Sequence, residues 1–183
     1  PDERNIASAV SQLVFPEQMN PHFFAYGSLP LYVIFFTGLV ATSFSTCQQA
    51  FAHCQITFEQ AIIISRFYSA LFSILLIPLL FFLGKRLYGE TGGILAAGLA
   101  TFSVGFIQFA HFGTTEMWLA LFSTLFFTLT LSLSRRLTVG KLVLLGLVSG
   151  ILIATKVSSL VLLILPLPAL YLAYRKQTSS KTN

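Results

Sequence analysis

Long apolar runs are the feature that most limits what this chain can fold into. Each run approaches or exceeds the roughly 18 to 20 residues that a helix needs to cross about 30 Å of hydrocarbon. Because a backbone inside lipid must satisfy its own hydrogen bonds, runs of this length predict helices. The predicted fold class is therefore all-α, a polytopic transmembrane helix bundle of about five spanning helices, at 61–84, 92–112, 117–134, 138–155 and 157–174.

Composition and charge agree with a membrane protein. The chain is 55% hydrophobic and 9% charged, with a mean hydropathy of +0.81, whereas soluble domains carry about 25% charged residues. Its basic residues form small clusters at the ends of apolar runs, which is the positive-inside pattern of cytoplasmic loops and argues against nucleic acid as a partner. The clusters are Lys85 with Arg86, Arg135 with Arg136 and Lys141, and Arg175 with Lys176.

Two weaker segments precede the spanning helices. Residues 5–15 are mildly amphipathic and predict a short helix lying at the membrane interface. Residues 29–44 are apolar but short for a span, so we expect them to lie along the outer leaflet. The resulting division is an extracytoplasmic first loop with juxtamembrane helices at 1–60, a transmembrane bundle at 61–176 and a polar tail at 177–183.

The alternation of basic clusters places the other ionisable residues on one side of the membrane. Charged groups beside spanning helices are costly, so those that remain are candidates for function. They are Asp2, Glu3, Arg4, Glu17, His22, His53, Glu59, Arg66, His111, Glu116 and Lys156.

The main candidates can also be explained without a functional role. The acidic pair at the start is compatible with solvated loop charges. Glu116 suits the first turn of a helix, where the helix dipole favours an acid. His111 fits an interfacial aromatic residue, and Lys156 and Arg66 can extend their charged ends to the outer interface.

The start of the chain and the cysteines add further expectations. The polar opening "PDERNIASAV" has no initiator Met, and we expect a membrane helix to precede Pro1. Cys47 and Cys54 are too few for a disulfide framework, and both a single loop disulfide and free thiols stay open. The sequence contains no glycine-rich phosphate loop, G-x-S-x-G or H-E-x-x-H motif.

The order of several blocks resembles the N-terminal half of the GT-C membrane glycosyltransferases, over nearly the whole chain. The branch is that of the protein O-mannosyltransferases and the aminoarabinose transferases of lipid A. The blocks are "PDERNIASAV", "NPHFFAYGSLPLY", "SRFYSALFSILLIPLLFFLGKRLYGETGGILAA", "QFAHFGTTEMWLALF" and "GILIATKVSSLVLLILP". The resemblance implies that the missing first segment is the first membrane helix.

The resemblance also implies roles for the acidic residues. In that family an acidic motif in the first extracytoplasmic loop supplies the catalytic carboxylate, which falls on Asp2 with Glu3 beside it. A second acidic position, usually Asp, is Glu116 here and is one methylene longer. These three residues are the predicted catalytic set, with Asp2 as general base and the others orienting the acceptor or holding a divalent cation; metal dependence stays open.

The basic candidates are predicted to hold the lipid phosphate of the donor. Lys156 matches a basic family position suited to that role, and Arg4, Arg66 and His111 complete the predicted set. Some members carry Lys before the Pro of the juxtamembrane block, where this chain has Leu29.

The implied function is inverting transfer of a sugar from a polyprenyl-phosphate donor to an acceptor lipid, glycan or protein. We expect an integral protein of a prokaryotic plasma membrane with its active site on the extracytoplasmic face and no nucleic-acid partner. Two alternatives stay open. A membrane transporter predicts ionisable groups near the bilayer midplane, and a non-catalytic membrane bundle does not need Asp2.

Overall fold

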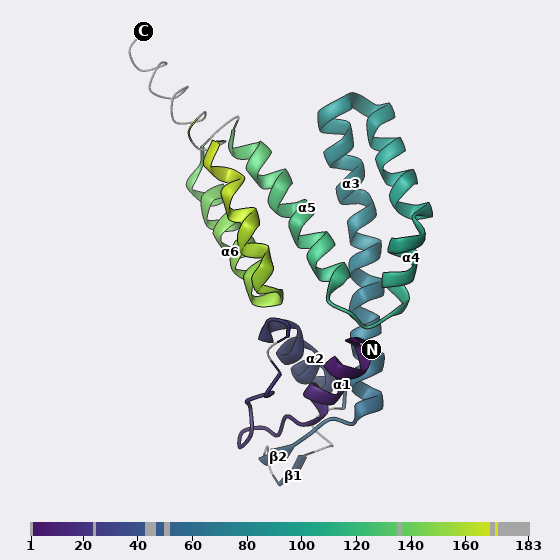
Figure 1. Cartoon of the computed structure of the whole chain (residues 1–183), viewed down its shortest axis with the longest axis vertical. Coiled ribbons are helices and arrows are strands. Elements are labelled where there is room, and N and C mark those ends of the chain that lie inside the picture. Colours follow the sequence, from purple (N-terminus) through teal and green to yellow (C-terminus); the bar gives the residue numbers. More distant parts are fainter. Residues whose placement is uncertain are drawn as a thin grey trace.

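A computed structural model describes residues 2–23, 25–42, 47–49, 52–134, 137–168 and 171, with the backbone alone at 47–49 and 52. Long helices run side by side, and two short helices and a pair of strands gather at one end of them (Figure 1). The described part is almost entirely helical, as predicted. The predicted clusters Arg135 with Arg136 and Arg175 with Lys176, and the predicted tail, lie outside the described residues.

The first short helix, α1 (Asp2–Ser11), is amphipathic. Ile6, Ala7 and Val10 are buried on one face at helical spacing, which fixes this face against the rest of the protein. The helix begins earlier than the predicted segment 5–15, because Asp2 and Glu3 occupy its first turn rather than a preceding loop. Acidic side chains stabilise that turn through the helix dipole, which explains the earlier start.

The second short helix, α2 (Ser28–Ala41), packs against α1, α3 and α6. Its buried face carries Leu31, Ile34, Phe35 and Leu39. At about 1.5 Å per residue its 14 residues extend roughly 21 Å, less than the hydrocarbon thickness.

Two short strands follow α2 and were not predicted. β1 (Cys47–Gln49) and β2 (Ala52–Cys54) pair antiparallel with Cys47 opposite Cys54. The backbone of Phe15 adds to β2 through two hydrogen bonds with Cys54, of 2.9 and 3.1 Å. The sequence left open whether Cys54 forms a disulfide or is a free thiol. In the structure Cys54 is disulfide-bonded.

The longest helix, α3 (Phe58–Phe102), is a hairpin of two helical legs. Thr57 caps its start, with the Thr57 hydroxyl accepting from the Gln60 backbone and the Gln60 side chain accepting in return. Gly89 reverses the direction with a positive φ of 78°, which glycine adopts without strain. The second leg leads into α4 (Val104–His111), so the helices predicted at 61–84 and 92–112 are present with α4 set off at Ser103.

The remaining helices form a second packed layer. α5 (Glu116–Leu133) lies along α3 through Trp118, whose ring centroid is 4.7 Å from that of Phe72. α6 (Val139–Thr155) runs back along α5. η1 (Val157–Ile164) is a 3₁₀ helix where an α-helix was predicted, and residues 166–168 after it are α-helical.

Two of the described helices, α3 and α5, are long and apolar enough to cross a membrane. Large apolar side chains such as Ile63, Phe67 and Leu99 are more than half exposed on the outside of the bundle, which suits contact with lipid. The opposite ends of α5 carry different charges: Glu116 begins it, and Arg86 donates to the carbonyl oxygen of Leu131 at its end. In Figure 1, α1 and the start of α5 lie at one end of the bundle, and the end of α5, to which Arg86 donates, lies at the other.

Candidate active site

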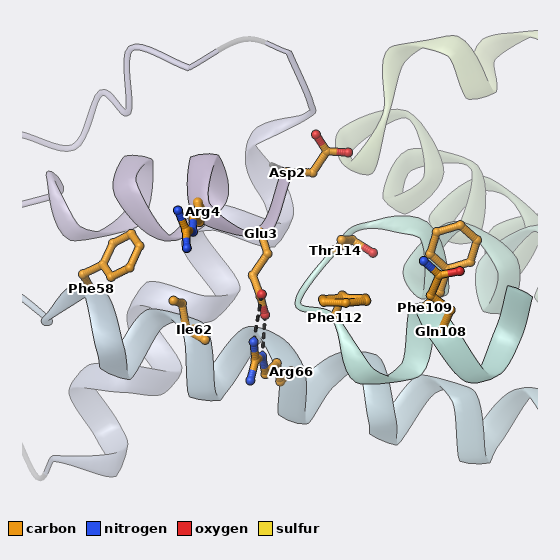
Figure 2. Close-up of a pocket in the computed structure, with 10 residues that line it drawn as sticks. All are labelled: Asp2, Glu3, Arg4, Phe58, Ile62, Arg66, Gln108, Phe109, Phe112 and Thr114. Atoms are coloured by element: carbon orange, nitrogen blue, oxygen red, sulfur yellow. Dashed lines mark hydrogen bonds and ion pairs between the residues drawn. The ribbon is translucent and has the colours of Figure 1, made fainter.

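The first element of the site is an ion pair between Glu3 and Arg66. The Arg66 guanidinium donates from Nε to Glu3 Oε1 at 2.6 Å and from its terminal nitrogen to Oε2 at 3.0 Å. This two-pronged geometry joins the first turn of α1 to the third turn of α3 (Figure 2). The pair therefore fixes the start of α1, and the predicted role of Glu3, orienting the acceptor or holding a divalent cation, stays a prediction.

The turn between α4 and α5 completes the surroundings of Glu3. The backbone N–H of Gly113 donates to Glu3 Oε1 at 2.9 Å. The hydrogen bond from Arg66 lowers the pKa of Glu3 most, and the Gly113 bond and the Arg66 charge lower it further against the opposing effect of burial. A Cβ at position 113 would overlap the side chain of Ser65, so only glycine lets this turn approach α3 so closely.

Asp2 lies beside Glu3 but points elsewhere. Figure 2 shows Glu3 directed toward Arg66 and Asp2 directed away from that pair. Burial and the negative charges of Asp2 and Glu116 raise the pKa of Tyr26. Asp2 is exposed, so its carboxylate is accessible to a ligand.

A second ion pair joins the end of α6 to the start of α5. Lys156 Nζ lies 3.3 Å from Glu116 Oε1, and both side chains are about one third exposed. Lys156 Nζ also lies 5.6 Å from the centroid of the Tyr26 ring, within the range of a cation–π contact. Tyr26 thus brings the segment before α2 next to the ion pair.

A pocket of about 910 Å³ opens at the start of α1. Its polar wall carries both acids of the first turn and two arginines, and its apolar wall comes from α3 and α4. Of these two arginines, Arg66 pairs with Glu3, whereas Arg4 makes no ion pair with a carboxylate of the described residues. The lining residues are Asp2, Glu3, Arg4, Phe58, Ile62, Arg66, Gln108, Phe109, Phe112 and Thr114.

The structure thus brings most of the predicted site residues to one end of the bundle. Four of them line the pocket, and Glu116 with Lys156 stands beside it. His111 is apart: it is exposed, does not line the pocket, and its Nδ1 lies 2.7 Å from the carbonyl oxygen of Ile107 one turn earlier. Sequence reasoning missed Tyr26 and Gly113, and the one signal for Tyr26 was its place in the block "NPHFFAYGSLPLY".

The carboxylates of the site face cations rather than one another. Among the residues that the structure describes, no group of three or more His, Cys, Asp or Glu side chains is placed to hold a metal ion. Glu3 and Glu116 each have a basic partner. The arrangement suits proton transfer at Asp2 and binding of an anion near Arg4.

Comparison with known families agrees with this chemistry. The family described as dolichyl-phosphate-mannose-protein mannosyltransferase matches residues 54–182, which is more than half of the chain. The chain belongs to this family. The resemblance seen in the sequence is confirmed, and membership implies a membrane glycosyltransferase that uses a polyprenyl-phosphate-linked sugar donor.

The match covers only part of the site. It begins at the last residue of β2, so α1 and α2 precede it, and with them Asp2, Glu3 and Arg4. No curated protein and no solved structure gives a significant match. The roles of the residues in α1 therefore rest on their geometry and chemistry.

Proposed function

We propose that this chain forms the catalytic end of an inverting glycosyltransferase, with Asp2 as general base. The observation that carries the proposal is that Asp2 and Arg4 line one large pocket, so that a base and a cation without an ion-pair partner among the described residues flank the same space. Sugar transfer from a lipid phosphate needs both, because one substrate loses a proton and the other leaves as an anion.

The reaction step follows from this arrangement. The acceptor hydroxyl gives its proton to the Asp2 carboxylate while its oxygen attacks the anomeric carbon of the donor sugar. The bond between that carbon and the phosphate oxygen breaks, and its electron pair leaves with the polyprenyl phosphate. Attack from the face opposite the leaving group inverts the anomeric centre.

Arg4 is the first candidate to stabilise the leaving phosphate. Arg66 and Lys156 were predicted for the same role, but each is engaged by a carboxylate, Glu3 and Glu116 respectively. Their positive charges still contribute to the field of the site, and their roles stay predictions, as does that of His111. The apolar side chains of the pocket, among them Phe109, provide a surface for the lipid.

We further propose that this end of the bundle faces the extracytoplasmic side. The disulfide at Cys54 lies at the same end as the pocket, and disulfides persist in oxidising compartments. The basic residues Lys85 and Arg86 lie at the other end, as the positive-inside rule expects for the cytoplasm. The division at 1–60, 61–176 and 177–183, the prokaryotic plasma membrane and the identity of the acceptor stay predictions.

The test is the substitution Asp2→Asn in the complete protein, which keeps the shape of the side chain and removes the base. Turnover is measured with polyprenyl-phosphate sugars, starting with dolichyl-phosphate-mannose and using whichever donor the unchanged protein accepts. Loss of a general base predicts a decrease of roughly 100-fold or more in kcat. The matched control is Glu17→Gln, an exposed carboxylate outside the pocket, which should retain activity.

Near-normal turnover in Asp2→Asn, with the protein inserted and folded as before, would refute Asp2 as the base. An equal loss in Glu17→Gln would also count against the proposal, because a general effect of removing acidic charge would then explain both results.

A further inference from the structure

Gln108 is a polar side chain on a helix that is otherwise mostly apolar. In α4, with the sequence VGFIQFAH, the one other polar side chain is His111 at its end. Gln108 is exposed and lines the large pocket at the start of α1. Its amide makes no hydrogen bond to the described residues, although an amide group can both donate and accept hydrogen bonds. This capacity is therefore available to a molecule that enters the pocket.

The turn after α4 brings a second polar group to the same pocket. Thr114 lines the pocket, and its hydroxyl oxygen is buried without a hydrogen-bond partner among the described residues. Figure 2 shows this hydroxyl directed to the side on which Gln108 lies. Buried hydroxyls without a partner are rare in folded proteins, because such a group loses its hydrogen bonds to water and gains none in exchange. A hydroxyl of a bound molecule supplies the partner that Thr114 lacks.

The turn that carries Thr114 is held in place on two sides. The hydroxyl of Ser69 in α3 donates to the carbonyl oxygen of Thr114 at 3.3 Å. The N–H of Gly113 donates to Glu3 Oε1 in α1 at 2.9 Å. These bonds keep the turn between α1 and α3, so Thr114 has a fixed position relative to the acids of α1.

The place of these groups in the pocket indicates which part of a substrate they meet. Asp2 and Arg4 come from α1, whereas Gln108 and Thr114 come from α4 and the turn after it, so they form another wall of the same pocket (Figure 2). In the proposed reaction the sugar lies between the base and the leaving phosphate, and its remaining hydroxyls face the other walls. Sugar hydroxyls both donate and accept hydrogen bonds, as an amide and a threonine hydroxyl require, whereas a polyprenyl chain does neither.

We propose that Gln108 and Thr114 bind hydroxyl groups of the donor sugar and thereby determine which sugar is accepted, an inference that rests on the proposed function. The substrate class is a polyprenyl-phosphate sugar with a free hydroxyl at the position that these side chains reach. Ligand pockets are mostly apolar and gain specificity from a few polar groups. A site that hydrogen-bonds a substrate hydroxyl discriminates strongly against an analogue without it, because the polar groups of the site are then left unpaired.

The test is a double-mutant cycle between the complete protein and its donor. The value of kcat/KM is measured for the unchanged protein and for Gln108→Leu. The donors are dolichyl-phosphate-mannose, or whichever polyprenyl-phosphate sugar the unchanged protein accepts, and the analogues that each lack one sugar hydroxyl. With the parent donor, Gln108→Leu should lower kcat/KM by about tenfold or more. With the analogue that lacks the bound hydroxyl, the two proteins should differ by about twofold or less, because neither can form the bond.

The matched control is Gln18→Leu, the same exchange at an exposed glutamine that does not line the pocket. Its kcat/KM should match that of the unchanged protein with every donor. A loss in Gln108→Leu that is equal for the parent donor and all analogues would reveal a structural effect and overturn the proposal. Full activity of Gln108→Leu with the parent donor would overturn it as well.

Thr114→Val keeps the test decisive if Gln108→Leu does not insert or fold. Valine keeps the shape of the side chain and removes the hydroxyl, so the loss should again depend on one hydroxyl of the sugar. If no variant that folds shows this dependence, the proposal is overturned.

The proposed function and this inference fail separately. Donor binding to the Asp2→Asn protein needs no base, and adding Gln108→Leu should weaken binding of the parent donor by about tenfold while leaving that of the analogue unchanged. Sugar transfer by Asp2→Asn at a normal rate refutes the base alone. An inactive Asp2→Asn whose donor affinities are the same with and without the Gln108 amide refutes the sugar contact alone.

Discussion

The substitution Gly27→Ala should be strongly destabilising, because Gly27 is where the segment before α2 meets the end of α6. Its backbone is in an ordinary extended conformation, with φ −69° and ψ 158°, so alanine meets no strain in the dihedral angles themselves. The obstacle is contact: a Cβ at this position would overlap the backbone carbonyl of Ala154 and lie 3.0 Å from the carbonyl carbon of Thr155.

The expected magnitude follows from what must move. The obstructing atoms belong to the backbone, so no side-chain rotation relieves the overlap, and overpacking of this kind costs about 1–3 kcal/mol. Separating the segments also weakens the 2.9 Å hydrogen bond from Gly27 to Thr155, worth about 1 kcal/mol. We expect the free energy of unfolding to fall by about 2–4 kcal/mol.

The assay is denaturant unfolding of the complete protein in detergent, followed by circular dichroism, together with sugar transfer. The matched control is Gly146→Ala in α6, where a new Cβ has no neighbour within 4 Å. Alanine there should cost nothing and can add up to about 1 kcal/mol through its higher helix propensity. Equal stability of Gly27→Ala and Gly146→Ala would refute the close packing of Gly27 on α6.

Three further predictions concern the ion pair, the phosphate and the topology. Glu3→Gln should lower the thermal midpoint at pH 7. Because the pKa of Glu3 is lowered on folding, the difference in midpoint between variant and unchanged protein should be largest above the ordinary pKa range of glutamate and should disappear as the pH falls through the lowered pKa. A difference that does not depend on pH would contradict the ion pair. Arg4→Gln should raise KM for the lipid-phosphate donor by about tenfold, the equivalent of one charge-assisted contact of roughly 1.4 kcal/mol, whereas Lys85→Gln at the other end of the bundle should not. After reduction, Cys47 and Cys54 should react with a membrane-impermeant thiol reagent added outside, and labelling from the cytoplasmic side alone would overturn the proposed orientation.

The sequence predicted the helices well where apolar runs are long. Runs ending near Gly84 and beginning near Gly92 gave the two legs of α3, although the structure continues helical backbone through most of the connection and turns at Gly89. Short-range patterns were less informative. The strands β1 and β2 have three residues each, too few to show an alternating pattern, and β2 also bridges to Phe15, which is distant in sequence.

The site was predicted in its residues but not in its partnerships. Positive-inside counting placed the acidic start and Glu116 on the same side, and the structure brings them to one end of the bundle. The counting of basic residues does not reveal that Glu3 pairs with Arg66, 63 positions away, or that Lys156 pairs with Glu116. Such pairings depend on which helix faces are apposed, and a membrane sequence with apolar residues on all faces carries little information about this.

The sequence by itself determined the class of this protein, because the cost of leaving backbone groups unpaired in lipid forces long apolar runs to become helices. It also determined the family, through blocks of residues along the chain. Only the tertiary structure decided how the two neighbouring acids differ. Glu3 turns toward Arg66 of α3 and binds it, whereas Asp2 points away from that pair, because successive residues of a helix point in different directions, about 100° apart.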